Sequence, residues 1–174
     1  MRVLSGEENE KALHYLNLSA EIAKKSTCLR SSCGSLIVKN SKIIGSGFNS
    51  LPLNKKIIEC KKESLPKTFK SDRTCCLHAE QRAIIDALRK NPEELNGSRL
   101  YFIRLNGEGE KMPAGEPYCT ICSKMALDTG FRNSFYFEMK AHVFTIQRST
   151  MTFHLNLDNY RVFAAASILY SILI

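Results

Sequence analysis

The order in which helix and strand patterns alternate constrains the fold of this 174-residue chain most. A capping-box motif, Ser5 followed three residues later by Glu8, precedes apolar residues at helical spacing. Polar turn residues separate the next two apolar runs, which is typical of a β-hairpin. In chain order, the patterns predict a helix over residues 6–25, strands over 35–38 and 43–48, a helix over 77–90, a strand over 100–105, a helix over 119–129 and a strand around 135–137.

This order predicts an α/β domain in which helices cover a mixed sheet. The first two strands are expected to be antiparallel, and strands linked through a helix are expected to be parallel. The length and the 44% hydrophobic content suit one domain with one sizeable core. We therefore predict a single domain over residues 1–174, with a further candidate strand at residues 143–146.

The chain carries 25 Lys and Arg against 17 Asp and Glu, a formal net charge of +8. Such a surplus favours an anionic partner, either a phosphate-bearing small molecule or a nucleic acid. Half of it lies in residues 49–76, where seven basic residues face three acidic ones. Phosphate contact and a merely solvated surface are equal alternatives for this loop. Because Arg offers a fixed pair of donors, Arg30 and Arg73 are better phosphate candidates than any Lys.

The chain has seven cysteines, and an odd number cannot all form pairs. The count therefore argues against a simple disulfide framework. The N-terminal residues turn acidic at once and have no apolar stretch of signal-peptide length. We therefore expect a cytoplasmic protein whose cysteines are reduced thiols or metal ligands.

The last 13 residues, from Val162 to Ile174, carry no charge and are almost wholly apolar. A membrane-spanning helix needs about 20 apolar residues. We therefore favour a terminal helix or strand packed on the core over membrane contact.

Two short motifs carry metal chemistry, and each lies at the expected start of a helix. The first is His78-Ala79-Glu80, and the second is Cys119-Thr120-Ile121-Cys122. One neutral His and two thiolates balance the charge of Zn²⁺ and leave its fourth tetrahedral position open, which is the catalytic arrangement. Such an ion lowers the pKa of a bound water from about 16 towards about 7.

Glu80 is the candidate proton carrier of this site. It lies two residues from His78, too close to share the direction of that ligand but still close to the ion. A carboxylate there can take a proton from water and pass it to a leaving amine. A redox Cys-x-x-Cys motif is the main chemical rival, but it explains neither His78 nor Glu80. The order H-x-E and then P-C-x-x-C is a known signature of zinc-dependent base deaminases.

The sequence resembles the cytidine and deoxycytidylate deaminase superfamily over about residues 12–137. The segments that carry the resemblance are STCLR at residues 26–30, GSGFN at 45–49, HAEQRAI at 78–84 and YCTICSKMA at 118–126. The resemblance implies a three-layer α/β/α sandwich with a central mixed sheet of about five strands. Residues 5–138 would then bear the motifs, while residues 139–174 match nothing in the family and are a candidate interface.

The resemblance also implies the roles of the site residues. His78, Cys119 and Cys122 would bind zinc, and Glu80 would shuttle the proton. Asn49, at the end of the second strand, would hydrogen-bond the sugar or the base. The substrate-binding candidates are Asn49, Ala79, Ser26, Arg30 and Arg73.

Three features depart from the family pattern. Tyr118 lies between Pro117 and the first Cys, where the family has Pro directly before it. Arg82 stands where deoxycytidylate deaminases usually carry Asn. The loop over residues 106–117 is longer than expected. These differences bear on the substrate more than on the metal.

The remaining cysteines allow a second, structural zinc site. Cys60, Cys75 and Cys76, with Cys28 and Cys33, would supply its ligands. We favour small buried residues and free thiols instead, because Cys is commonly buried without a partner.

The sequence thus predicts a hydrolase acting on C–N bonds, which deaminates a cytosine nucleotide or nucleoside with release of ammonia. Conversion of dCMP to dUMP is favoured, because the run from Ser26 to Arg30 looks most like the deoxycytidylate branch. One alternative is a deaminase of tRNA adenosine or another nucleobase, and another is a non-catalytic zinc-binding interaction domain. We expect a small-molecule substrate, one catalytic zinc ion, a homo-oligomer and no membrane contact, with nucleic acid as the second choice of partner.

Overall fold

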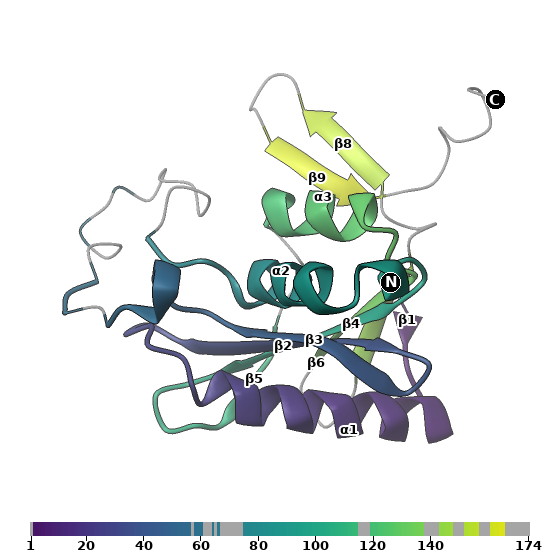
Figure 1. Cartoon of the computed structure of the whole chain (residues 1–174), viewed down its shortest axis with the longest axis horizontal. Coiled ribbons are helices and arrows are strands. Elements are labelled where there is room, and N and C mark those ends of the chain that lie inside the picture. Colours follow the sequence, from purple (N-terminus) through teal and green to yellow (C-terminus); the bar gives the residue numbers. More distant parts are fainter. Residues whose placement is uncertain are drawn as a thin grey trace.

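The computed structural model describes residues 2–56, 58–60, 64, 66, 75–114, 119–137, 143–147, 152–156 and 161–165. These residues form three layers, with a mixed sheet between one helix on one face and two helices on the other (Figure 1). The helices are α1 (Gly6–Ala23), α2 (Ala79–Lys90) and α3 (Thr120–Asp128). The strands of the sheet are β1 (Arg2–Val3), β2 (Ser32–Lys39), β3 (Lys42–Phe48), β4 (Arg99–Leu105), β5 (Lys111–Met112), β6 (Asn133–Phe137) and β7 (Val143–Gln147).

The sheet has the order β1-β7-β6-β4-β2-β3, with the short strand β5 paired to β4. Only β4 and β6 pair in parallel among these strands, and α3 makes the crossover between them. The hairpin of β2 and β3 is antiparallel, as expected. The predicted three-layer α/β/α sandwich is confirmed. Its central five strands are β7, β6, β4, β2 and β3, and the two-residue strands β1 and β5 extend the sheet.

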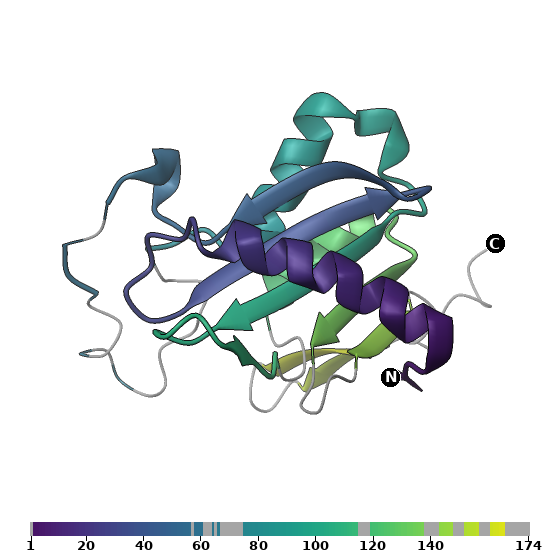
Figure 2. The ribbon, with the colours of Figure 1, turned by 90° about the horizontal axis from the view of Figure 1, so that it is seen from below.

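Two apolar clusters hold the layers together, one on each face of the sheet. The first packs α1 on the sheet around Leu16, Tyr101 and Phe135, and α1 crosses the whole sheet on that side (Figure 2). The second packs α2 and α3 on the opposite face around Ile84 and Leu100. Alternate residues of β4 therefore enter different clusters, as the period of two in a strand requires.

The start of α1 corrects one sequence expectation. Ser5 is the N-cap residue, but its side chain makes no capping hydrogen bond. The next residue, Gly6, has a φ of +55°, which only Gly adopts at low cost. In a capping box, the residue after the N-cap has ordinary helical backbone angles. The left-handed Gly6 departs from them, so the Ser5–Glu8 motif does not act as a capping box.

Close packing of α2 on β3 depends on Gly47. A Cβ at this position would lie 2.4 Å from both the Ala79 carbonyl oxygen and the Ala83 nitrogen. Any side chain would therefore push the first turn of α2 away from the sheet. The absence of a side chain at Gly47 fixes where the residues at the start of α2 lie.

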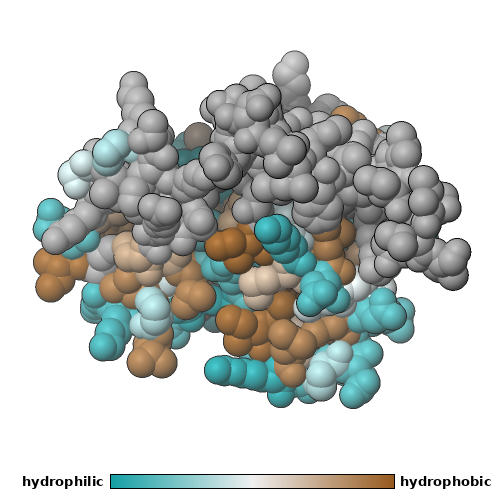
Figure 3. All heavy atoms as spheres, turned by 90° about the horizontal axis from the view of Figure 1, so that it is seen from above, coloured by the Kyte–Doolittle hydropathy of each residue, from teal (hydrophilic) through white to brown (hydrophobic). Residues whose placement is uncertain are grey.

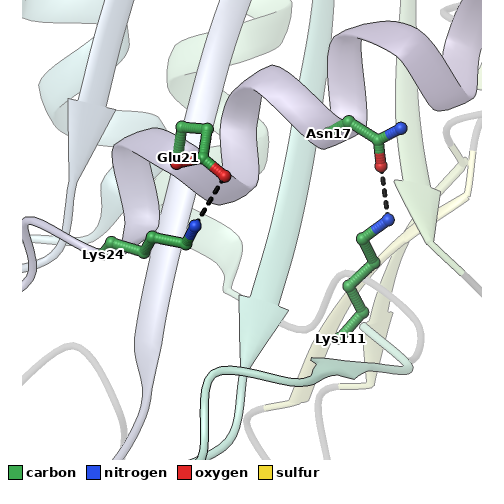
Figure 4. A network of polar contacts seen from close by, with 4 residues as sticks. All are labelled: Asn17, Glu21, Lys24 and Lys111. Atoms are coloured by element: carbon green, nitrogen blue, oxygen red, sulfur yellow. Dashed lines mark hydrogen bonds and ion pairs between the residues drawn. The ribbon is translucent and has the colours of Figure 1, made fainter.

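The outer surface of α1 carries polar contacts (Figure 4). Lys24 Nζ lies 2.6 Å from Glu21 Oε1, one turn away on the same helix. Lys111 of β5 donates a hydrogen bond to the Asn17 side chain, which ties β5 to α1. The first pair is exposed, so it contributes little to stability.

The C-terminal part adds strand structure. The candidate strand at residues 143–146 is confirmed as β7, which pairs with β6. Two further strands, β8 (Thr152–Asn156) and β9 (Arg161–Ala165), form a separate hairpin, and β9 contacts α3 (Figure 1). The start of the apolar tail, from Val162, thus lies in β9, while residues 166–174 lie outside the described residues.

The described residues contain no helix long and apolar enough to cross a membrane. Among the described residues seen from the side of α2 and α3, hydrophobic and hydrophilic side chains lie next to one another (Figure 3).

Candidate metal centre

His78 is the N-cap residue of α2. Its backbone N–H donates a hydrogen bond of 2.9 Å to Gln81 Oε1, which closes one half of a capping box. The residue before it, Leu77, donates to the Ser50 carbonyl at 3.0 Å, which ties this segment to the chain just beyond β3. The backbone of His78 is thus held by α2 on one side and by the end of the hairpin on the other.

Cys119 occupies the same position at the start of α3. It is the N-cap residue, and its Sγ accepts a hydrogen bond of 3.4 Å from the Cys122 backbone N–H. Both cysteines are buried. A helix N-terminus carries a partial positive charge, which favours thiolate over thiol.

The fold brings the three candidate ligands together. One ligand atom each from His78, Cys119 and Cys122 lies within 4.8 Å of the others, and His78 Nδ1 lies 3.3 Å from Cys122 Sγ. Around a tetrahedral Zn²⁺, such atoms lie about 3.5–3.8 Å apart, given Zn–N and Zn–S bonds of about 2.0 and 2.3 Å. The donor set and its spacing therefore fit one zinc ion with three protein ligands.

The two thiols perturb each other. A hydrogen bond between their side chains, the largest cause for both, lowers the pKa of Cys119 far below its usual range. The same contact, with burial, raises the pKa of Cys122.

Glu80 lies in the first turn of α2, two residues after His78. Burial of its carboxyl group raises its pKa to about 7, although its own backbone N–H and His78 act in the opposite direction. A carboxyl group with such a pKa both accepts and releases a proton near neutral pH. Its electrostatic interactions with His78, Cys119 and Cys122 suit a proton carrier.

Asn49 directly follows β3, and only 7% of it is exposed. Its side chain is hydrogen-bonded to Ser26 and Ser31, which precede β2, and to Cys33 at the start of that strand. Two of the predicted site residues, Asn49 and Ser26, are therefore in direct contact with each other.

The other substrate-binding candidates differ in their placement. Ala79 is fully buried, with 0% exposed, so its side chain is packed inside the protein. Arg30 is exposed in the segment between α1 and β2. Arg73 lies outside the described residues, as do four of the six lysines of the basic loop.

Sequence reasoning missed three residues around the centre. Gln81 holds the backbone of His78, as described above. Tyr136 of β6 is buried, and burial followed by the negative charge of Glu80 raises the pKa of its hydroxyl. Arg104 lies level with Cys33 in the β2–β4 pair, which places an exposed cation at the same edge of the sheet. The capping-box spacing from His78 to Gln81 was the one available sequence signal, since the other two contacts depend on strand register.

Among the described residues, the His78–Cys119–Cys122 group is the one cluster able to hold a metal ion. The second site, which the sequence allows but does not favour, is not assembled among these residues. Cys75 Sγ and Cys76 Sγ lie 4.0 Å apart, and Cys28 interacts with Cys76, but these thiols do not form a ligand group like that of His78, Cys119 and Cys122. All seven cysteines are free thiols.

Comparison with known proteins agrees with this centre. A family model described as "Cytidine and deoxycytidylate deaminase zinc-binding region" matches residues 9–138. The deoxycytidylate deaminase of Mycobacterium phage D29 is 28% identical over 131 residues, which cover 71% of this chain and 91% of the phage protein. The deoxycytidylate deaminase of Saccharomyces cerevisiae is 30% identical over 81 residues, and the match spans 44% of this chain and 25% of the yeast protein.

A solved structure of a dCMP deaminase also aligns with this chain. The dCMP deaminase from the cyanophage S-TIM5, in complex with dCMP and dUMP, aligns with a TM-score of 0.51 and 25% identity. That alignment covers 75% of this chain and 82% of the cyanophage chain. The chain spans about a quarter of the length of its first two curated relatives, which are both yeast proteins.

Proposed function

Because the chain belongs to the cytidine and deoxycytidylate deaminase zinc-binding family, we propose that it deaminates dCMP hydrolytically to dUMP, with release of ammonia. The observation that carries the proposal is the convergence of His78, Cys119 and Cys122 within 4.8 Å, with the carboxyl group of Glu80 on the adjoining helical turn. This is the donor set of a catalytic zinc site, with one coordination position left for water.

The residues of the centre divide the chemistry between them. His78, Cys119 and Cys122 would hold Zn²⁺, which when bound lowers the pKa of water and so supplies a nucleophile at neutral pH. Glu80 accepts a proton from the water that adds to C4 of the pyrimidine. It delivers this proton to N3, then accepts the proton of the new C4 hydroxyl group and passes it to the departing amine, so that water and cytosine become uracil and ammonia.

The choice of dCMP rests on the relatives. Three matched curated proteins are named deoxycytidylate deaminase, and the cyanophage structure holds dCMP and dUMP. The exposed cations Arg30 and Arg104 support a phosphate-bearing substrate, since Arg binds phosphate through paired donors. Asn49, Ser26 and Arg30 are the proposed substrate-side residues, and Arg73 and Ala79 keep that role as sequence predictions.

The proposed protein is cytoplasmic and forms a homo-oligomer. A reducing, cytoplasmic compartment suits the thiolates that a zinc site needs. Homo-oligomerisation is supported by large apolar side chains on the surface, since Leu53 is 88% and Ile58 97% exposed. Sedimentation of the zinc-loaded protein would measure its assembly.

The decisive experiment offers the purified zinc protein a panel of amines and measures ammonia release. The panel contains dCMP, CMP, cytidine, adenosine, guanine and tRNA. We expect the highest kcat/KM for dCMP. Release from tRNA alone would replace the proposal with a nucleic-acid deaminase, and no release from any of them, with zinc bound, would favour a non-catalytic interaction domain.

A further inference from the structure

The hydrogen bonds of Asn49 limit what its side chain can offer to a ligand. Asn49 Oδ1 accepts from the Cys33 backbone N–H at 2.8 Å and from Ser26 Oγ at 2.7 Å. Asn49 Nδ2 donates to the Ser31 carbonyl at 2.9 Å. An amide oxygen accepts two hydrogen bonds and an amide nitrogen donates two. The oxygen is therefore saturated, and within the described part of the chain one Nδ2 hydrogen is left without an acceptor.

Ser26 is the only side chain in this arrangement besides Asn49 itself, because Ser31 and Cys33 contribute backbone groups. Its hydroxyl hydrogen is shared between Asn49 Oδ1 and the Asn49 carbonyl oxygen, each 2.7 Å away. Ser26 Oγ in turn accepts a hydrogen bond from the Cys28 backbone N–H at 3.1 Å. Protein groups thus use the hydroxyl hydrogen and one of the two lone pairs of Ser26 Oγ, and the turn that follows α1 sets the geometry of the hydroxyl.

We propose that Ser26 is a positioning residue, which fixes the Asn49 amide so that it presents a single N–H donor to the substrate. The inference rests on the proposed function, and it changes the role of Ser26 from substrate contact to support of Asn49. It also defines the complementary group, because the atom of the substrate that meets Asn49 must be a hydrogen-bond acceptor, such as a hydroxyl or carbonyl oxygen. A hydrogen-bond donor of the substrate could not bind at that point, because Asn49 Nδ2 does not accept hydrogen bonds.

The position of Asn49 explains why its orientation matters to the reaction. The next residue, Ser50, pairs with Leu77, which directly precedes His78. The Asn49 amide is therefore connected by a short stretch of backbone to the start of α2, where His78 and Glu80 lie. A rotated amide would misplace the substrate relative to those residues, and small errors in the placement of reacting groups lower the reaction rate strongly.

The test compares four variants of the zinc-loaded protein with the wild type: Ser26→Ala, Ser26→Thr, Asn49→Ala and the double variant of Ser26→Ala and Asn49→Ala. We expect Ser26→Ala to lower kcat/KM for dCMP by about 10- to 100-fold and Ser26→Thr, which keeps the hydroxyl, to restore it. The double variant should be no worse than Asn49→Ala alone, because Ser26 acts through Asn49. Zinc content should be the same in all of them.

Ser19→Ala is the matched control, because the Ser19 hydroxyl, like that of Ser26, donates to a backbone carbonyl, that of Tyr15, at 2.9 Å. It removes a hydroxyl from α1 without touching Asn49, so kcat/KM should stay within about twofold of the wild type. Wild-type kcat/KM in Ser26→Ala would overturn the proposal. A double variant that loses the product of both single effects would also overturn it, because Ser26 would then act independently of Asn49.

A second measurement separates this inference from the proposed function. The side-chain amide signals of Asn49 in a ¹⁵N NMR spectrum report its hydrogen bonds without any substrate. We expect Ser26→Ala to shift them and Ser26→Thr and Ser19→Ala to leave them near their wild-type positions. Unchanged Asn49 signals in Ser26→Ala would overturn the inference even in an enzyme active on dCMP, whereas shifted signals in a protein inactive on dCMP would refute only the proposed substrate.

Discussion

His78 Nδ1 lies 3.3 Å from Cys122 Sγ, although 44 residues separate them in the sequence. The contact arises because β3 and β4 are both antiparallel to β2 and therefore end at the same edge of the sheet. The helices that follow them, α2 and α3, begin side by side at that edge and contact each other. This order of strands and helices thus places the two N-cap residues, His78 and Cys119, close together at one edge of the sheet.

Removing one thiolate should remove the metal. In Cys122→Ser we expect the zinc content to fall from about one ion per chain to a small fraction, because an alcohol oxygen is a poor ligand for zinc compared with a thiolate. Elemental analysis of the purified proteins measures this. Cys75→Ser, at an exposed cysteine outside the centre, is the matched control and should keep its zinc.

Zinc should also stabilise the fold. A ligand present at 1,000 times its Kd adds about 4 kcal/mol to the free energy of unfolding, or roughly 8–16 °C in Tm for a chain of this size. Thermal unfolding with and without a chelator should show this difference in the wild type and a much smaller one in Cys122→Ser. Equal Tm values for the wild type in both conditions would argue against a bound ion.

Replacement of Glu80 by Gln should abolish proton transfer and spare the metal. We expect kcat to fall by about 10²- to 10⁴-fold, because Gln has nearly the same shape but its amide does not accept or release a proton near neutral pH. Zinc content and Tm should not fall, since the substitution removes a carboxylate that burial disfavours. Glu93→Gln, at an exposed position on the turn after α2, is the control. Activity of Glu80→Gln within about tenfold of the wild type would contradict the assigned role.

Gly47→Ala should disturb the centre from a distance. The new methyl group would lie 2.4 Å from the Ala79 carbonyl oxygen, so α2 must move or the strand must bend. Overpacking of this kind costs about 1–3 kcal/mol in the free energy of unfolding. We expect a lower midpoint in urea together with weaker zinc retention in a chelator competition. Gly107→Ala, whose Cβ would meet nothing within 4 Å, should leave both quantities unchanged.

Cys33 should resist alkylation at ordinary pH. Burial, followed by the negative charge of Glu80, raises the pKa of its thiol to about 12. At pH 8 only about one molecule in 10⁴ then carries the reactive thiolate. Brief treatment with iodoacetamide should modify the exposed Cys75 and leave Cys33 intact, as measured by peptide mass spectrometry. Raising the pH towards 11 should speed the reaction at Cys33, and comparable rates for the two cysteines at pH 8 in the folded protein would refute the shift.

Local sequence patterns predicted the helices and strands that have one apolar face. The helices α1, α2 and α3 and the strands β2 to β4 lie within a few residues of their predicted bounds, because burial of one face imposes a period on the sequence. The capping box at Ser5 was wrong, and the one at His78 was missed, because a cap depends on backbone angles that residue types do not fix. The hairpin of β8 and β9 carries no comparable period, and it was not predicted.

The sequence by itself determined the chemistry of the candidate site: one imidazole, two thiolates and one carboxylate at helix starts, with the spacing that a catalytic zinc ion requires. Tertiary structure decided which partners hold these groups. Ser26, Asn49 and Cys33 meet through the register of β2 and β3, and Gly47 lets α2 approach the sheet. Such contacts join residues distant in the chain, so they follow from strand register and helix packing and leave no local pattern in the sequence.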